Sequence, residues 1–281
     1  MRNILSIDLE GSIEGKSAIY NNKTILGEDK KSLYEIRKNL DIILEFLNTH
    51  KVKATFFTLS RIIKLAPEIG LQIIQNNHEL ASHGFRHLFL DQMSDKEIEE
   101  YVYSSKSIIE DATGSKIYGF RAPFFSVGRK KELIFDTLAK NNYVYDSSIF
   151  PIKGHDLYGC HWDSPNEIKR LNNGLIEMPL STLNVLGKNF PALGGGYLRL
   201  LPISFSRFSL KHLNNNNKVG LVYIHPYEIG GNYSEHVKSN FLQKIRFYRN
   251  IGNVTRQKMT SLFNISKFTS HYEFLKDQKF C

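Results

Sequence analysis

The sequence predicts an α/β protein built on a parallel sheet that is either wound open or closed as a barrel. Short apolar, β-branched runs alternate with stretches of helical periodicity through the first half of the chain, and such repeated strand and helix units favour parallel sheets. The chain has 281 residues, close to the ~250 residues of one α/β barrel. Its composition, 41% hydrophobic and 23% charged residues, allows a full core and excludes disordered and fibrous classes.

The expected strands of the first half cover 4–7, 53–59, 79–82, 117–120 and 143–145. The expected helices between them cover 32–47, 69–75, 94–110 and 130–140. Two of these helices begin with a Ser-x-x-Glu capping box, in which each of the two side chains bonds the backbone N–H of the other residue. The boxes are Ser32 with Glu35 and Ser94 with Glu97.

The regular pattern stops between residues 150 and 217, where Gly, Pro and Asn are frequent. This predicts a long insertion with a few strands. The run from Val219 to Ile224 is typical of a buried strand and ends on His225. We therefore expect a (β/α) domain over residues 1–235 and a basic, aromatic helical extension over 236–281.

Two cysteines, Cys160 and Cys281, are too few for a zinc cage or a disulfide scaffold. The N-terminus reaches Asp8 before an apolar segment as long as that of a signal peptide has formed. No run of about 18 apolar residues is present. These observations predict a cytoplasmic protein.

The net charge of +9 arises from 37 basic and 28 acidic residues. Much of the excess lies in one stretch without Asp or Glu, whose cations are Lys238, Lys244, Arg246, Arg249, Arg256, Lys258 and Lys267. One interpretation is a solvated helix face whose aromatic residues pack on the domain. The other is a peripheral patch for anionic lipid head groups or a phosphorylated substrate. Nucleic acid is not an expected partner, because no binding motif accompanies the charge.

Titratable side chains follow the predicted strands, and functional residues of parallel α/β folds collect at the carboxyl ends of strands. The relevant segments are Asp8-Leu-Glu10, His83-Gly-Phe-Arg-His87, Arg121-Ala-Pro123, Asp146 and His225. Two histidines four residues apart reach one ion if the segment turns helically. A carboxylate from another strand then completes a site with three protein ligands and open positions. A surface histidine pair and a solvated acidic turn are the alternatives.

This set of residues resembles the polysaccharide deacetylase family, carbohydrate esterase family 4. The resemblance rests on the acidic motif at residues 8–10, Glu79-Leu-Ala-Ser-His-Gly-Phe-Arg-His87, Arg121-x-Pro123, Tyr145-Asp-Ser-Ser148 and Tyr223-Ile-His-Pro226. It implies a deformed (β/α)7-type barrel with an insertion around 150–217. Gly194-Gly-Gly-Tyr-Leu-Arg199 and His225-Pro-Tyr-Glu228 look most like the branch associated with exosortase and exopolysaccharide loci.

The resemblance implies a hydrolase that removes N-acetyl groups from an amino-sugar unit with one divalent metal. Zn is the default, and Co, Mn or Ni also suit the site. Glu10, His83 and His87 would hold the metal, and Asp8 would be the general base. Arg121 would orient Asp8, and a backbone N–H near Phe124 would hold the oxyanion. His225 would be the general acid.

The sequence departs from the family pattern in three places. Leu9 separates the two acidic residues, so base and ligand roles could be exchanged between Asp8 and Glu10. Gly84 replaces a frequent Ser or Thr, and the carboxylate expected to polarise His225 is missing from its usual place. Asp146 is the nearest substitute, and its alternative role is structural, at the end of its strand. Trp162 is interpreted either as a core residue or as a platform for a sugar ring.

Three alternatives remain at the sequence level. The same fold and metal could open a small cyclic amide or imide. The chain could be an inactive sugar-binding homologue, since its first and fourth motifs are altered. Two histidines and one carboxylate also suit a non-haem iron oxygenase, but the usual all-β fold of such enzymes conflicts with the strand and helix alternation.

Overall fold

The computed structural model describes residues 1–12, 14, 29–153, 159–160, 162–232, 245 and 247–280. The strands are β1 (Arg2–Leu9), β2 (Thr55–Thr58), β3 (Glu79–Ser82), β4 (Gly119–Phe120), β5 (Tyr145–Asp146), β6 (Lys169–Arg170), β7 (Ile176–Glu177), β8 (Thr182–Val185), β9 (Lys188–Pro191), β10 (Leu221–Ile224) and β11 (Lys267–Thr269). Within the described residues, nine of them form one sheet in the order β10-β1-β2-β3-β4-β5-β7-β6, with β11 also paired to β1. From β10 to β7 every pairing is parallel. The predicted barrel-type α/β fold is therefore present.

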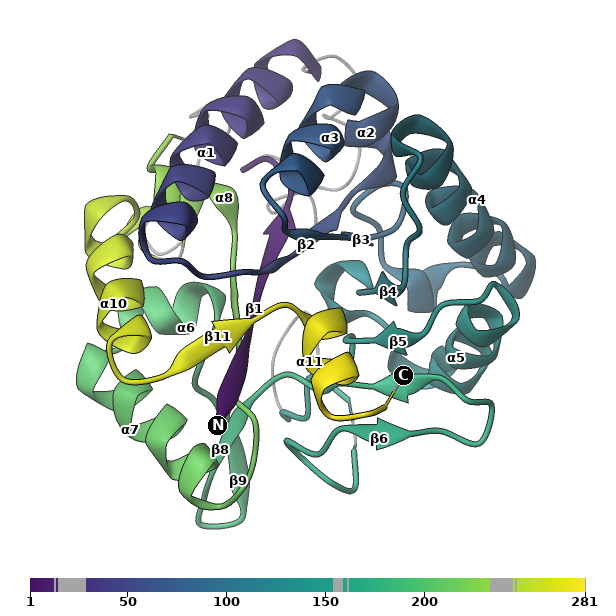
Figure 1. Ribbon diagram of the computed structural model, residues 1–281. Coiled ribbons are helices and arrows are strands. Elements are labelled where there is room, and N and C mark those ends of the chain that lie inside the picture. Colours follow the sequence, from purple (N-terminus) through teal and green to yellow (C-terminus); the bar gives the residue numbers. More distant parts are fainter. Residues whose placement is uncertain are drawn as a thin grey trace.

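The helices are α1 (Asp29–Thr49), α2 (Ser60–Leu65), α3 (Pro67–Gln75), α4 (Asp95–Thr113), α5 (Lys131–Lys140), α6 (Gly195–Leu200), α7 (Ile203–Asn215), α8 (Pro226–Gly230), α10 (Asn253–Phe263) and α11 (His271–Asp277). Short 3₁₀ turns occur at η2 (Leu90–Gln92), η3 (Pro123–Phe125) and η4 (Gly128–Lys130). Figure 1 shows α1 to α5 and α10 surrounding the curled sheet. Within the described residues, no helix is long and apolar enough to cross a membrane.

Strand β1 shows how the sequence sorts side chains between the two faces of the sheet. Leu5, Ile7 and Leu9 are buried in the main core cluster, which they share with α1 residues such as Leu40. The alternate residue Ile4 belongs to a second buried cluster with residues of β2, β3, β5 and β7. Side chains alternate between faces along a strand, so Ser6 and Asp8 lie on the same face as Ile4, inside the curled sheet. This face carries the polar chemistry.

One of the two predicted capping boxes is confirmed and the other is wrong. Ser94 accepts a hydrogen bond from the N–H of Glu97 and its own N–H bonds the Glu97 carboxylate, as a capping box requires. Helix α1, in contrast, begins at Asp29, so Ser32 lies within its first turn. The Ser32 hydroxyl donates to Glu14, and Glu35 accepts from Ser12. These side chains bind the segment after β1 instead of capping the helix.

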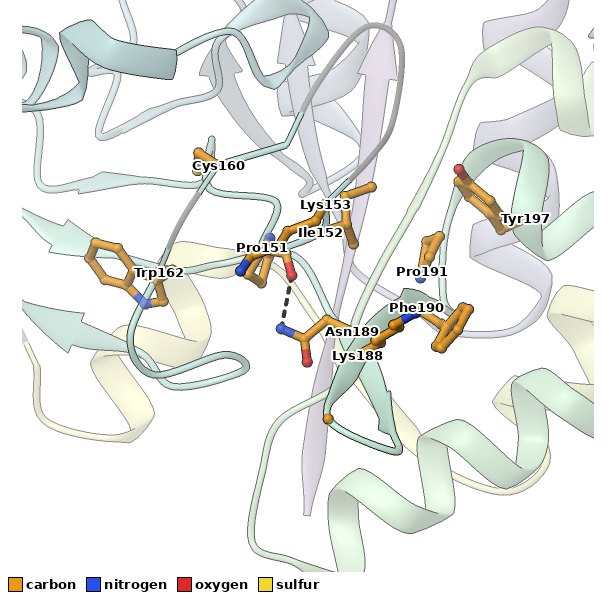
Figure 2. A pocket seen from close by; sticks show the side chains of 11 residues that line it. Pro151, Ile152, Lys153, Cys160, Trp162, Lys188, Asn189, Phe190, Pro191 and Tyr197 are labelled. Carbon is orange, nitrogen blue, oxygen red and sulfur yellow. Dashed lines mark hydrogen bonds between the residues drawn. The ribbon is translucent and has the colours of Figure 1, made fainter.

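The segment predicted as an insertion contributes to the sheet. It contains β7, which pairs in parallel with β5, and β6, which is antiparallel to β7. It also contains the β8–β9 hairpin and the helices α6 and α7. Together with residues 151–153, Cys160, Trp162 and the start of α6, the hairpin lines a cavity of about 720 Å³ (Figure 2). One part of this segment thus extends the main sheet, and another part lines the cavity.

The C-terminal segment returns to the N-terminal strand. Strand β11 pairs with β1 at Arg2 to Ile4, and α11 follows it (Figure 1). His271 at the start of α11 is fully buried and stacks on Tyr145 at a ring distance of 5.3 Å. Its backbone N–H donates to Thr55, the first residue of β2. We call this end of the sheet, formed by Thr55, Glu79, Tyr145 and His271, the floor. The division at residue 235 stays a prediction.

Candidate active site

The opposite end of the sheet, where the parallel strands end, gathers the predicted site residues; we call it the rim. Asp8 and Glu10 are both 2% exposed, whereas Leu9 between them is buried in the helix-facing core. The two-residue repeat of a strand places both carboxylates on the inner face. The spacing that departs from the family pattern therefore brings both acids to one site.

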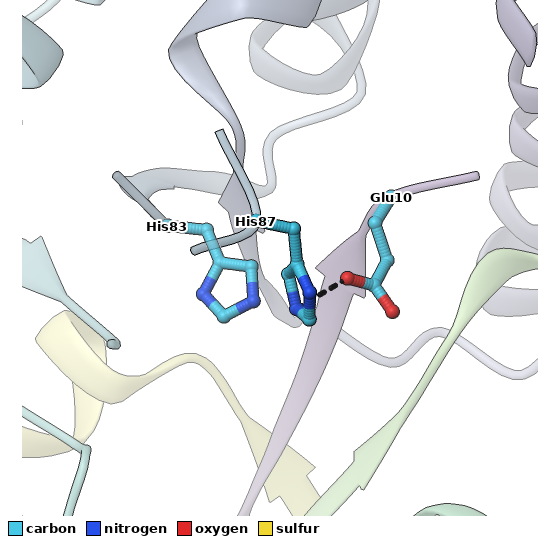
Figure 3. A group of neighbouring side chains, drawn as sticks. All are labelled: Glu10, His83 and His87. Carbon is cyan, nitrogen blue, oxygen red and sulfur yellow. Dashed lines mark ion pairs between the residues drawn. The ribbon is translucent and has the colours of Figure 1, made fainter. Parts of the chain in front are cut away.

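Glu10, His83 and His87 form a candidate metal centre (Figure 3). All three are buried, and each offers one ligand atom within 4.8 Å of the others. Nε2 of His87 lies 2.7 Å from Oε2 of Glu10. One carboxylate and two imidazoles are a donor set that suits zinc and similar divalent ions. The three residues come from β1 and from the loop after β3.

The surroundings hold His83 and Glu10 in the forms that bind metal. Nδ1 of His83 lies 2.7 Å from the carbonyl oxygen of Arg121, which leaves Nε2 facing the site. Burial lowers the pKa of His83 to about 4, so this imidazole is neutral near pH 7. Burial alone would raise the pKa of Glu10, but the neighbouring histidines outweigh it and lower that pKa. A neutral imidazole and an ionised carboxylate are the forms that coordinate metals.

Gly84 has a structural reason for replacing the frequent Ser or Thr. Its φ of +79° lies in the left-handed region, and a Cβ here would collide with the ring of Tyr101. Its carbonyl accepts a hydrogen bond from Ser60, and the Tyr101 hydroxyl donates to Arg86. The tight loop between the two histidines therefore requires glycine.

Arg121 lies beneath the site with no exposed surface. Its Nη1 donates to Oδ1 of Asp8 at 2.7 Å and to Ser6 at 2.8 Å. Its other donors bind the carbonyl and the hydroxyl of Ser147, and Phe57 covers the guanidinium at 4.1 Å. This network fixes the Asp8 carboxylate and leaves Oδ2 outside the contact with Arg121.

His225 lies beside Glu10. Its imidazole is held by a second carboxylate, to which sequence reasoning assigned no role. Its Nδ1 lies 3.0 Å from Oε2 of Glu228, and its Nε2 lies 3.4 Å from Oε1 of Glu10. Glu228 is fully buried and also accepts from Arg199. Burial would lower the pKa of His225, but Glu228, Glu10 and Asp8 raise it to about 9. His225 is therefore protonated near pH 7.

Asp146 does not take the position proposed for it beside His225. Its carboxylate accepts from the N–H and the hydroxyl of Ser148, two residues further along. Burial raises its pKa, and burial with the Asp146 charge raises that of Glu177 well above the ordinary value. The contact with His225 comes instead from Glu228, which follows it by three residues in α8. The contacts of Asp146 with Ser148 are those expected from its alternative, structural role, which stays a prediction.

The turn after Arg121 has unusual backbone conformations. Phe124 and Phe125 have φ values of +55° and +52°, and both are buried. Such conformations in non-glycine residues are costly and often occur at functional sites. The Phe124 ring packs against His87 at 4.0 Å and stacks on Phe89 at 4.2 Å. The Phe124 side chain therefore contacts the candidate metal centre through His87.

Comparisons with known proteins agree with this geometry. The polysaccharide deacetylase family model matches residues 29–144, and a domain of unknown function, DUF3473, matches residues 147–276. A peptidoglycan deacetylase of Helicobacter pylori is 22% identical over 143 residues, which are 51% of this chain and 47% of the relative. Over residues 29–144 the chain is therefore similar to polysaccharide deacetylases. The chain spans about half the length of the curated relatives that it matches first.

Solved structures show the polysaccharide deacetylase fold over nearly the whole chain. A Mycobacterium smegmatis protein assigned to the polysaccharide deacetylases has a TM-score of 0.63 at 15% identity, covering 99% of this chain and 92% of that one. The allantoinase Puue has a TM-score of 0.58 at 14% identity, covering 95% and 85%. The deacetylase family match includes His83, His87 and Arg121. The family match begins at residue 29, so it does not include Asp8 and Glu10. The fold brings these two residues to the rim.

Glu228 and Arg199 are the functional candidates that sequence reasoning left without a role. Both lie in motifs that the sequence had singled out, Gly194 to Arg199 and His225 to Glu228. The two motifs meet in the structure, because Nε of Arg199 donates to Glu228. The signal was the three-residue spacing of His225 and Glu228 around Pro226, which is typical of a helix start.

Proposed function

We propose that this protein is a metal-dependent hydrolase that removes N-acetyl groups from an amino-sugar unit of a polysaccharide or of its nucleotide- or lipid-linked precursor. One observation carries the proposal. At a single rim, the Glu10, His83 and His87 donor set lies between a buried Asp8–Arg121 pair and a protonated His225. The names of the relatives and the deacetylase family model point to the same chemistry.

A divalent ion of the zinc type, held by Glu10, His83 and His87, would polarise the acetamide carbonyl and favour loss of a water proton. Asp8 takes that proton at Oδ2, because Oδ1 is bound by Arg121. Donation from Arg121 keeps the Asp8 carboxylate aligned, so we assign Asp8 as base and Glu10 as ligand. The backbone N–H at Phe124 stabilises the developing oxyanion.

His225 acts at the other end of the scissile bond. It donates its proton to the amine nitrogen as the C–N bond breaks, and the products are acetate and the free amino sugar. Glu228 is a positioning residue, because it orients the imidazole through Nδ1 at 3.0 Å and favours its protonated form. Arg199 and Glu228 belong to the two motifs that resemble the exopolysaccharide-locus branch, and their side chains are in contact. This contact supports our proposal that the substrate belongs to exopolysaccharide synthesis.

The test is metal content per chain in wild type and in the His87→Ala variant after dialysis against a mild chelator. We expect about one equivalent in the wild type and loss in the variant, because two of three ligands hold a metal far less tightly. Acetate release from N-acetylated sugars is then measured beside ring opening of cyclic amides. Absence of metal from both proteins after reloading with Zn, Co or Mn would sink the hydrolase proposal and favour a sugar-binding homologue.

We also propose a cytoplasmic location with peripheral contact of the basic C-terminal segment to anionic membranes. Lys238, Lys244 and Arg246 lie outside the described residues. Arg256 donates to the Ile229 carbonyl and Lys258 to the Leu198, Arg199 and Leu201 carbonyls. These two cations are therefore used within the fold. Absence of binding to anionic vesicles at low salt would contradict the membrane proposal.

A further inference from the structure

The cavity beside the β8–β9 hairpin has no role in the proposed reaction. Its described lining comes from residues 151–153 with Cys160 and Trp162, from the hairpin at 187–191, and from Tyr197 in α6. Figure 2 places Trp162 and Tyr197 at opposite sides of the set, with the hairpin residues below. A volume of about 720 Å³ is in the range of small-molecule sites.

Aromatic side chains line this cavity. Phe190 is 46% exposed, and Trp162 and Tyr197 are partly exposed. The indole N–H of Trp162 is buried and has no hydrogen-bond acceptor among the described residues. A buried donor without an acceptor is costly, and aromatic rings combine an apolar face with polar edges. This lining suits a ligand with flat apolar faces and many oxygen acceptors, which describes sugar rings.

The charge of the lining is one-sided. Lys153 and Lys188 are exposed cations at the cavity, and among its described lining residues there is no Asp or Glu. Within the described residues neither lysine forms an ion pair, in contrast to Lys130, which pairs with Asp95 at 2.8 Å. Asn189, next to Lys188 in the hairpin, donates to the Pro151 carbonyl at 2.9 Å. The polar groups of the cavity therefore favour an anionic ligand.

The cavity and the rim share a wall. Ile152 lines the cavity and packs in one buried cluster with Phe125 and Tyr223. The Tyr223 ring lies 6.0 Å from that of His225 and also packs on Gly194 and Gly195, from which α6 leads to Tyr197. Both sides of the cavity are thus anchored on a residue that touches the proposed general acid.

We propose that this cavity binds sugar rings of the substrate chain adjoining the acetylated unit, and that these rings carry carboxylate or phosphate groups. The inference rests on the proposed function for its link to catalysis. Trp162 and Phe190 contact the ring faces, the indole N–H donates to a ring substituent, and Lys153 and Lys188 bind the anionic groups. Sugar chains without anionic groups bind more weakly, because Lys153 and Lys188 then form no ion pair with the ligand.

Trp162 is the single tryptophan of the chain, so its fluorescence reports directly on the cavity. The probes are trigalacturonic acid, N-acetylglucosamine 1-phosphate and neutral tri-N-acetylchitotriose, added to full-length protein carrying Asp8→Asn. We expect saturable emission changes with a charged probe and at least about tenfold weaker binding in Lys188→Glu, the effect of one charge-assisted contact. Lys211→Glu, on the exposed side of α7, is the matched control and leaves binding unchanged.

Calorimetry with Phe190→Ala and Trp162→Phe gives the second measurement. Phe190 is exposed enough for truncation without unfolding, and Trp162→Phe keeps a ring but removes the N–H donor. Tyr103→Ala, an exposed aromatic on α4, is the control. We expect both cavity variants to bind the charged probe more weakly. Equal binding of the neutral and acidic trisaccharides overturns the charge assignment, and no binding of any probe overturns the site.

The two proposals fail in different ways. Acetate release by a metal-loaded enzyme whose KM is unaffected by Lys188→Glu would refute the cavity and leave the proposed function intact. Probe binding by a protein that holds no metal and releases no acetate would refute the hydrolase and, with it, the role of the cavity as a substrate subsite. A raised KM for an acidic substrate with unchanged kcat supports both.

Discussion

The rim and the floor are two buried polar clusters at opposite ends of the same sheet, and their histidines differ. At the rim, Glu228, Glu10 and Asp8 overcome the effect of burial and raise the pKa of His225 to about 9. At the floor, burial and then Arg121 lower the pKa of His271 well below its ordinary value. Burial is common to both, so the neighbouring charges decide the protonation state. The rim brings several carboxylates and imidazoles together, whereas the floor has one of each, Glu79 and His271.

The largest expected effect is at the rim, in Asp8→Asn. We expect kcat to fall on the order of 10²–10⁴-fold, as for loss of a general base, because the amide cannot accept the water proton. Metal content should stay near the wild-type value, since the three ligands remain. The measurement is steady-state acetate release beside metal analysis. Metal loss in this variant would indicate that Asp8 is the metal ligand and Glu10 the general base.

At the floor, His271→Ala should lower stability and leave catalysis unchanged. The imidazole stacks on Tyr145 and meets the Phe57 ring edge at 5.2 Å, so its removal leaves a cavity. We expect a loss of about 2–4 kcal/mol in the free energy of unfolding. Denaturant titration measures it, with kcat and metal content of the folded protein as controls. A large drop in kcat at full folding would contradict a purely structural floor.

Glu228→Gln tests whether the charge of Glu228 controls the protonation of His225 at the rim. Loss of the carboxylate lowers the pKa of His225, so the proton that it donates is lost at lower pH. We expect kcat/KM to fall about 10–100-fold and its alkaline limb to move to lower pH. A pH–rate profile from about pH 6 to 10 checks this. A drop in rate without a shift of the limb would indicate that Glu228 acts only on local packing.

A smaller effect concerns pH and His78, which precedes β3. Burial, with the charge of Lys53, lowers its pKa from 6.5 to about 4, and its Nδ1 accepts from the Ala54 N–H. The unfolded chain therefore binds a proton at higher pH than the folded one, and stability falls as pH drops from 6.5 through about 4. His78→Gln should flatten this slope in unfolding titrations. An unchanged slope would exclude His78 as its source.

The sequence predicted what depends on short-range pattern. The strand runs, the Ser94 box and the residues at strand ends were recognised because their signals are local. Ser32 was misassigned because its partner, Glu14, belongs to the segment after β1, and sequence alone does not show that contact. Glu228 was left without a role for a different reason. Its spacing from His225 was visible, but the desolvation and the Arg199 contact that make it an effective partner arise only in the fold.

The pairing of β11 with β1 has a consequence for synthesis on the ribosome. The strand that carries Asp8 and Glu10 is translated early, yet two of its three partners, β10 and β11, are translated late. Contacts between distant parts of a chain form slowly, so during translation β1 keeps unpaired edges that a nascent-chain chaperone can bind. Glu10, the proposed metal ligand that follows β1, is therefore fixed only after these partners have left the exit tunnel. On our proposal, metal would therefore bind only to a chain whose folding is complete.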